Sequence, residues 1–275
     1  MLKLSMMSST AGRVSAEKVV EIAKYSGCGG IEWINSHGSS GKELRKLVDD
    51  SGLKTVAYTM YDETFVNRES NYLDKFKEHL EIASDAGAPH VMIPPFARVD
   101  SKGLEEDRKE WTEYFAEIYP LAKDAGMTLT LESTGLPDSP IVKADEILEV
   151  LKAVPGLKVV FDNGNTFSAD DPVSAYRKLL PWIIHVHMKD SYISDVPCEK
   201  AILRRNGKYL RPALIGQGDY DLRGFLKLLQ ETGYDRWITL ETSDPERIVP
   251  IQKALKTVAE RVTHWEQEGF VCKKR

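Results

Sequence analysis

Two histidines, a lysine and an aspartate close the apolar segment 182–190, WIIHVHMKD. Because side chains alternate faces along a strand, His185, His187 and Lys189 would share one face, with the two histidines about 6 to 7 Å apart. Such a histidine pair either binds a metal or belongs to a hydrogen-bonded core. The rest of the chain decides between these two interpretations.

Three further apolar segments end in a carboxylate. MTLTLE ends at Glu132, LKVVFD at Asp162 and RWITLE at Glu241. With His187 these residues form an oxygen-rich donor set that suits Mn²⁺, Mg²⁺ or Co²⁺ and can also hold Zn²⁺. One carboxylate after a strand is as often a helix N-cap or a salt-bridge partner, but four donors at strand ends indicate a shared cation. His185 would lie one layer deeper, as a hydrogen-bond donor or a packed core residue.

A repeated unit can bring these distant segments together. Six times an amphipathic segment passes through a glycine into a short apolar run, at Gly27, Gly52, Gly87, Gly126, Gly156 and Gly233. Helix, C-terminal glycine and strand in this order and spacing indicate parallel strands joined by crossover helices. Adding the segments LKLSMM and WIIHVHM gives eight strands, so the chain is predicted to be an α/β protein, a single-domain (β/α)8 TIM barrel over residues 1–275.

The helices of this barrel are expected near residues 15–26, 40–51, 70–86, 104–125, 143–153, 172–179, 221–232 and 248–265. Segment 191–220 is expected to be one long loop. A doubly wound sheet is the rival architecture, but no G-x-G-x-x-G follows the first strand. In a barrel the active site lies at the C-terminal strand ends, where the four donors fall on the last four strands.

The composition of the chain limits which binding partners can be expected. The 37 basic and 42 acidic residues give a formal net charge of -5, which offers no footprint for nucleic acid. Cys28, Cys198 and Cys272 fit neither a disulfide framework nor a cysteine zinc site, which indicates a reducing compartment. A signal-peptide pattern is missing, and no segment approaches the ~18 apolar residues of a membrane span. We therefore expect a cytoplasmic protein that binds a small molecule and neither nucleic acid nor membrane.

The chain resembles the xylose isomerase-like superfamily of TIM barrels over nearly its whole length, through the segments LTLES, VVFDNGN, HVHMKD and IGQGDYDLRGFLKLLQETGYDRWITLET. That superfamily includes sugar isomerases, ketose 3-epimerases, hydroxypyruvate isomerase, inosose dehydratase and, more distantly, endonuclease IV. The resemblance implies one divalent cation, Mn²⁺ before Mg²⁺, Co²⁺ or Zn²⁺, held by Glu132, Asp162, His187 and Glu241. Glu132 and Glu241 would also act as catalytic acid–base groups, and relatives suggest a homodimer or homotetramer.

The leading hypothesis is therefore a sugar or sugar phosphate isomerase or epimerase that forms a metal-stabilised enediolate from a small polyol ketone. An inosose dehydratase-like lyase, the alternative, would share this intermediate but expel a β-hydroxyl. Two hypotheses rank lower. An endonuclease IV-like phosphodiesterase needs a three-zinc cluster with more histidines, and a sugar-binding barrel without turnover would not need both Glu132 and Glu241.

Two positions depart from the epimerase pattern. Ketose 3-epimerases usually carry a histidine where this chain has Asn165 and an arginine where it has Ile193. The H-x-K-D ending is more similar to the inosose dehydratase side of the superfamily. That similarity makes Lys189 a substrate-binding or catalytic group, with a solvated lysine at a loop edge as an equal alternative.

Substrate contacts are expected from Asn165, His185, Lys189, Glu32 and Asp138. Glu32 and Trp33 would close the second strand at the barrel mouth, with simple rim packing as the other explanation. Asp138 follows Glu132 by six residues, where epimerase relatives carry a substrate-binding acid. Residues 204–211, RRNGKYLR, gather four basic side chains that suit phosphate or carboxylate, although a solvated loop is the more usual explanation.

Overall fold

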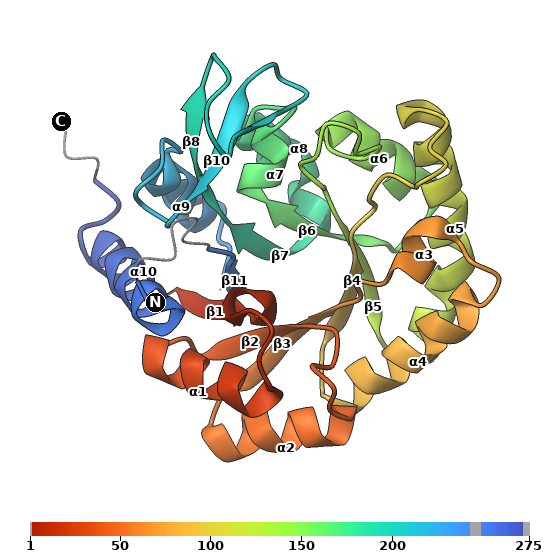
Figure 1. Ribbon diagram of the computed structural model, residues 1–275, viewed down its shortest axis with the longest axis horizontal. Helices are drawn as coiled ribbons and strands as arrows, with labels where there is room; N and C mark the ends of the chain where they lie inside the picture. Colours follow the sequence, from red (N-terminus) through yellow and green to blue (C-terminus); the bar gives the residue numbers. More distant parts are fainter. Residues whose placement is uncertain (1, 243–248, 272–275) are drawn as a thin grey trace.

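The computed structural model describes residues 2–242 and 249–271, and it confirms the predicted TIM barrel. Eight parallel strands close in the order β1-β11-β7-β6-β5-β4-β3-β2, and helices surround them (Figure 1). The barrel strands are β1 (Lys3–Met7), β2 (Gly30–Ile34), β3 (Lys54–Thr59), β4 (His90–Ile93), β5 (Thr128–Glu132), β6 (Lys158–Asp162), β7 (Ile183–Met188) and β11 (Trp237–Leu240). No helix within the described ranges is long and apolar enough to cross a membrane.

The eight predicted helices all occur, within a few residues of their expected bounds. They are α1 (Ala16–Ser26), α2 (Gly41–Ser51), α4 (Tyr72–Asp85), α5 (Leu104–Asp124), α6 (Ala144–Ala153), α8 (Pro172–Leu179), α9 (Leu222–Glu231) and α10 (Ile251–Gln267). Residue 248, the expected start of the last helix, and Cys272 lie outside the described residues. Sequence periodicity did not predict the short elements η1 (Ser8–Ala11), α3 (Glu63–Asn67), α7 (Asn163–Phe167) and η2 (Leu180–Trp182).

Glycines end the first two long helices, as the repeat predicted. Gly27 and Gly52 adopt the left-handed backbone, with φ of 80° and 74°, and their N–H groups bond the last carbonyls of α1 and α2. Glycine reaches this conformation without a Cβ clash, so the chain can turn sharply into the next strand. Each turn of this kind starts a new barrel strand close to the end of the preceding helix.

Alternation along β6 shows how the strands aim their polar residues. Phe161 points outward, where its ring lies 5.2 Å from that of Tyr176 in α8 and 5.8 Å from that of Phe225 in α9. Because neighbouring strand residues face opposite sides, Asp162 points into the barrel. Burial of the aromatic cluster thus fixes the direction of the carboxylate.

Segment 191–220 is not one long loop, so that prediction is wrong. It contains most of an antiparallel sheet of order β8-β10-β9, formed by β8 (Asp190–Ser194), β9 (Ile202–Leu203) and β10 (Tyr209–Ala213), which rises above the end of β7 (Figure 1). These strands are short, mostly exposed or half-buried, and paired with one another. They therefore lack the continuous apolar run by which the barrel strands were found.

Asp190 joins this sheet to the barrel. Its buried carboxylate accepts hydrogen bonds from the backbone N–H groups of Gly216, Gly218, Ser191 and Tyr220, at 2.8 to 3.3 Å. Three of these donors come from a segment 26 to 30 residues away and are satisfied by one side chain. The segment that returns from β10 is thereby fixed above the C-terminal end of β7.

Candidate active site

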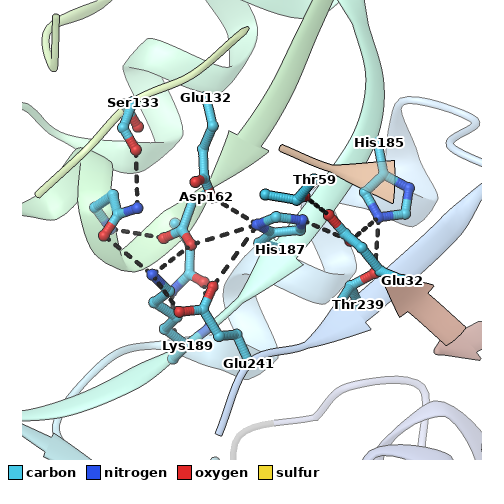
Figure 2. Close-up of polar contacts among 12 residues, drawn as sticks. Glu32, Thr59, Glu132, Ser133, Asp162, His185, His187, Lys189, Thr239 and Glu241 are labelled. Carbon is cyan, nitrogen blue, oxygen red and sulfur yellow. Dashed lines mark hydrogen bonds and ion pairs between the residues drawn. The ribbon is translucent and has the colours of Figure 1, made fainter. Parts of the chain in front are cut away.

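Four donor atoms from strand ends meet at one side of the barrel (Figure 2). They belong to Glu132 at the end of β5, Asp162 at the end of β6, His187 in β7 and Glu241 just after β11, and all lie within 4.8 Å of one another. Nδ1 of His187 is 2.5 Å from Glu132 Oε1, 3.8 Å from Glu241 Oε2 and 4.0 Å from Asp162 Oδ2. The structure thus brings together the four residues that the sequence singled out.

Asp162 serves as a helix cap and also presents an unused oxygen. Its Oδ1 accepts a hydrogen bond of 2.6 Å from the backbone N–H of Asn165 and so caps α7. Its Oδ2 is buried and forms no hydrogen bond among the described residues, and the Lys189 ammonium lies 3.2 Å from it. Burial raises the pKa of Asp162 to about 6, although the positive charge of Lys189 acts against the shift.

The donor set fits a divalent cation. Three carboxylates and one imidazole nitrogen provide hard ligands for such an ion, and Oδ2 of Asp162 forms no hydrogen bond among the described residues. Asp162 and His187 are fully buried and Glu132 nearly so, whereas the Glu241 side chain is 29% exposed. A cation held here would face solvent on the side of Glu241.

Glu32 lies beneath His187. It was expected to close the second strand at the barrel mouth, and the structure does not place it there. It is fully buried in β2, which continues to Ile34, and its Oε2 lies 2.8 Å from Nε2 of His187. Its Oε1 accepts a 2.7 Å hydrogen bond from Thr59. With Nε2 bonded to a carboxylate, His187 keeps Nδ1 for the cluster, the arrangement that orients histidine ligands in metal sites.

His185 supports this contact from below. It is 1% exposed, and its Nε2 lies 3.0 Å from Glu32 Oε2 and 2.7 Å from Thr239 Oγ1. The side chain is one layer deeper than His187, as expected, and its contacts are with Glu32 and Thr239. Burial would raise the pKa of Glu32, but His187 and His185 hold it well below its usual range.

Lys189 points into the cluster. Its Nζ lies 2.8 Å from Glu241 Oε1, 3.2 Å from Asp162 Oδ2 and 3.2 Å from Asn165 Oδ1 (Figure 2). Burial alone would lower the pKa of Lys189, but the carboxylates of Asp162 and Glu241 outweigh it and raise the pKa above its usual value. The side chain is therefore charged, and it is not the solvated lysine that the sequence left open.

The segment VVFDNGN holds Lys189 in place, which the sequence did not reveal. The Asn163 side chain accepts a hydrogen bond from the Lys189 N–H and donates one to its carbonyl, at 2.9 and 3.1 Å. A Cβ on Gly164 would lie 2.9 Å from the Cβ of Lys189, so only glycine leaves room for this approach. Asn165 accepts from the ammonium and donates its own amide hydrogen to the Ser133 carbonyl.

A cavity of about 270 Å³ opens beside these residues. Its lining includes Asn165, Lys189 and Glu241, together with Arg204 and Tyr220 from the segment after β8. Asp138 lies in an exposed turn after β5 and is not among the described residues that line this cavity. Among the expected substrate contacts, Asn165 and Lys189 reach the cavity.

Metal affinity should fall as the pH falls from about 8 to 5, because protons compete for two donors. Burial raises the pKa of Asp162 to about 6. Burial opposes charge on His187, but Glu32 and Glu132 outweigh it and raise its pKa well above the usual range. Both groups hold their protons below these pKa values, so affinity should drop roughly tenfold per pH unit for each proton displaced. Calorimetric titration with Mn²⁺ across this range measures the slope, and an affinity independent of pH would contradict it.

Comparison with known proteins supports the assignment as a TIM barrel. A family model described as xylose isomerase-like TIM barrel matches residues 20–264. The rhizopine catabolism protein MocC of Rhizobium meliloti is 26% identical over 267 residues, 88% of this chain and 79% of that protein. The inosose dehydratase of Clostridium tetani is 23% identical over 264 residues, 87% of this chain and 86% of that protein.

Two solved structures share the fold. The IOLI protein with a bound zinc atom superposes with a TM-score of 0.75 at 20% identity and covers 95% of this chain and 96% of its own. An L-ribulose 3-epimerase gives 0.73 at 16% identity, with 98% of this chain and 95% of its own covered. At these identities the likeness concerns the fold alone.

Proposed function

The chain belongs to the xylose isomerase-like TIM barrel family, and from this premise we propose that it is a metal-dependent lyase that removes water from a polyhydroxylated ketone. The observation that carries the proposal is the contact of 2.8 Å between the Lys189 ammonium and Glu241 within the donor cluster. Dehydration needs one group that accepts the proton on the α carbon and another that donates to the departing hydroxyl. A carboxylate and an ammonium in contact supply both.

The metal would be held by Glu132, Asp162, His187 and Glu241, with Mn²⁺ as our first choice. Bound there, a divalent cation would polarise the substrate carbonyl and make the neighbouring C–H bond more acidic. Glu241 is the most exposed of the four residues and lines the cavity, so it accepts this proton. Glu132 is nearly buried and is not among the described residues that line the cavity, so it has the role of a ligand.

Elimination then balances through Lys189. The C–H electron pair forms the new C=C bond, the C–O bond to the β carbon breaks, and Lys189 donates a proton so that the hydroxyl leaves as water. Glu241 is now protonated and Lys189 neutral. Proton transfer across their 2.8 Å contact restores both groups for the next turnover.

Isomerisation or epimerisation, the leading hypothesis from the sequence, is the second candidate. Glu132 and Glu241 come from different strands and converge on one cluster, so they could serve two faces of one carbon. Two departures weigh against it. Asn165, which stands where epimerases usually carry a histidine, cannot exchange protons at neutral pH and is occupied by Lys189 and Ser133. Ile193 lies in β8, paired with Leu210 of the sheet above β7.

Replacing Lys189 by Met should separate proton removal from water loss. Elimination should fall by about 10² to 10⁴-fold, the usual contribution of a proton donor, because the hydroxyl no longer receives a proton. Exchange of the α proton with solvent should persist, because Glu241 is intact. The assay incubates a panel of polyol ketones with Mn²⁺-loaded protein in D₂O and follows both deuterium uptake and the absorbance of the unsaturated product.

Lys208→Met is the matched control for this prediction. Lys208 is 42% exposed and pairs with Asp195 on the sheet above β7, so its loss should change neither rate. Epimeric ketones formed by the wild-type protein without water loss would support the second candidate. Deuterium uptake into no ketone of the panel would contradict both candidates.

A further inference from the structure

One wall of the cavity carries an arginine with an unused donor. Arg204 follows β9, is half-buried, and lines the cavity with Lys189 and Tyr220. Its Nη1 donates a 2.7 Å hydrogen bond to the Gly135 carbonyl, but its Nε is buried and has no hydrogen-bond partner among the described residues. A buried N–H without an acceptor is costly and is usually explained by a missing ligand or water.

Arg205, the next residue, shows how a partly buried arginine is usually paired with a carboxylate. Its guanidinium binds Glu146 through two contacts of 2.6 and 3.0 Å and also donates to the Ser139 carbonyl. Arg204, in contrast, is held by a neutral carbonyl, and burial lowers its pKa. Its charge is thus compensated far less than that of its neighbour.

Tyr220 lines the same cavity and carries a second unpaired donor. Its hydroxyl is buried, with Ser191 as a polar neighbour but no hydrogen bond of normal geometry among the described residues, and its ring lies 4.8 Å from that of Phe167. Burial raises the pKa of Tyr220 to about 12, so the hydroxyl keeps its proton. The bond from its backbone N–H to Asp190 fixes the residue beside the cavity.

We propose that Arg204 and Tyr220 form a subsite for an acidic group, a carboxylate or a phosphate, so that the ketone dehydrated by this protein is an anion. A guanidinium fork matches the oxygens of either group, and an acid in the cavity would compensate the charge of Arg204, which is bonded to a neutral carbonyl. A neutral polyol could accept these hydrogen bonds but would leave the guanidinium charge uncompensated. This inference rests on the proposed function, because it takes the cavity as the substrate site.

Binding to the Mn²⁺-loaded full chain tests the subsite, with D-glucuronate, D-glucose 6-phosphate and D-glucose as calorimetric probes. At least one acid should bind roughly tenfold or more tightly than D-glucose, since hydrogen bonds to charged groups have effects of this size. Arg204→Gln should lower the affinity for that acid by roughly tenfold to a hundredfold and leave D-glucose unchanged. Arg204→Lys should recover part of the loss, because the charge returns without the fork.

Arg205→Gln is the matched control. It should lower the melting temperature through loss of the Glu146 pair but keep the preference for the acid, and melting curves of each variant establish that it is folded. The preferred acid, carboxylate or phosphate, identifies the group that the subsite takes.

Three outcomes would overturn the inference: D-glucose bound as tightly as both acids, Arg204→Gln weakening all three probes equally, or neither acid bound. Water loss from a neutral ketone without any preference for acids would remove this inference and leave the proposed function standing. Preference for an acid without deuterium uptake into any ketone would remove the proposed function and leave the acid-binding subsite standing.

Discussion

Glu241→Gln should nearly abolish turnover while the metal stays bound. Glutamine keeps an oxygen for the cation and for the Lys189 ammonium, which lies 2.8 Å from Glu241 Oε1, but it cannot accept a proton from carbon. The rate should therefore fall by about 10² to 10⁴-fold, with a further loss because one ligand is no longer charged. Deuterium uptake should fall together with water loss, since the blocked step comes first.

Two measurements on the same preparation check this expectation: metal content by atomic emission and the initial rate of water loss. Glu113→Gln, an exposed position in α5, is the matched control and should leave both unchanged. A rate near that of the wild-type protein would show that Glu241 is not the base. Loss of metal together with activity would show that its main role is to hold the cation.

His187→Ala should act on the metal first. The imidazole is the one nitrogen donor of the cluster and its Nδ1 faces all three carboxylates. Because loss of an outer partner of a ligand already costs about 10 to 100-fold in affinity, loss of the ligand itself should exceed roughly a hundredfold. Excess Mn²⁺ should restore part of the activity, because Glu241 and Lys189 remain in place.

His185→Asn separates ligation from support. His185 touches Glu32 and Thr239 and lies beneath His187, so its replacement should lower metal affinity by roughly tenfold at most. Competition with a chelator measures both variants on one scale. Loss of metal from His185→Asn but not from His187→Ala would reverse the roles assigned to the two histidines.

Much of the fold follows from local signals in the chain. Six of the long helices end at or near a glycine of the repeat and each barrel strand is an apolar run, so both types of element and their order were predictable. The strand ends then located Glu132, Asp162, His187 and Glu241, because parallel strands bring their C-terminal ends to one side of the barrel. These residues converge because of the barrel topology, and the regular alternation of helices and strands along the sequence predicts that topology.

Contacts across the barrel were not predictable in this way. Glu32 and His187 are 155 residues apart, and no local pattern indicates that their side chains meet, so Glu32 was placed at the mouth. The side chain of Asn163 bonds both the N–H and the carbonyl of Lys189, and this contact likewise depends on the neighbouring strand. Likewise, among the described residues β8 and β10 pair only with each other and β9, and their mostly half-buried residues form no continuous apolar run.

An anomalous-scattering map of Mn²⁺-soaked crystals tests the central claim most directly. We predict a single peak within coordination distance of Glu132, Asp162 Oδ2, His187 Nδ1 and Glu241, with His187 Nε2 still bonded to Glu32. Asp162 Oδ2, which forms no hydrogen bond among the described residues, would then bind the cation. A map without a peak at this cluster, or with the cation on Nε2 of His187 beside Glu32, would contradict the account.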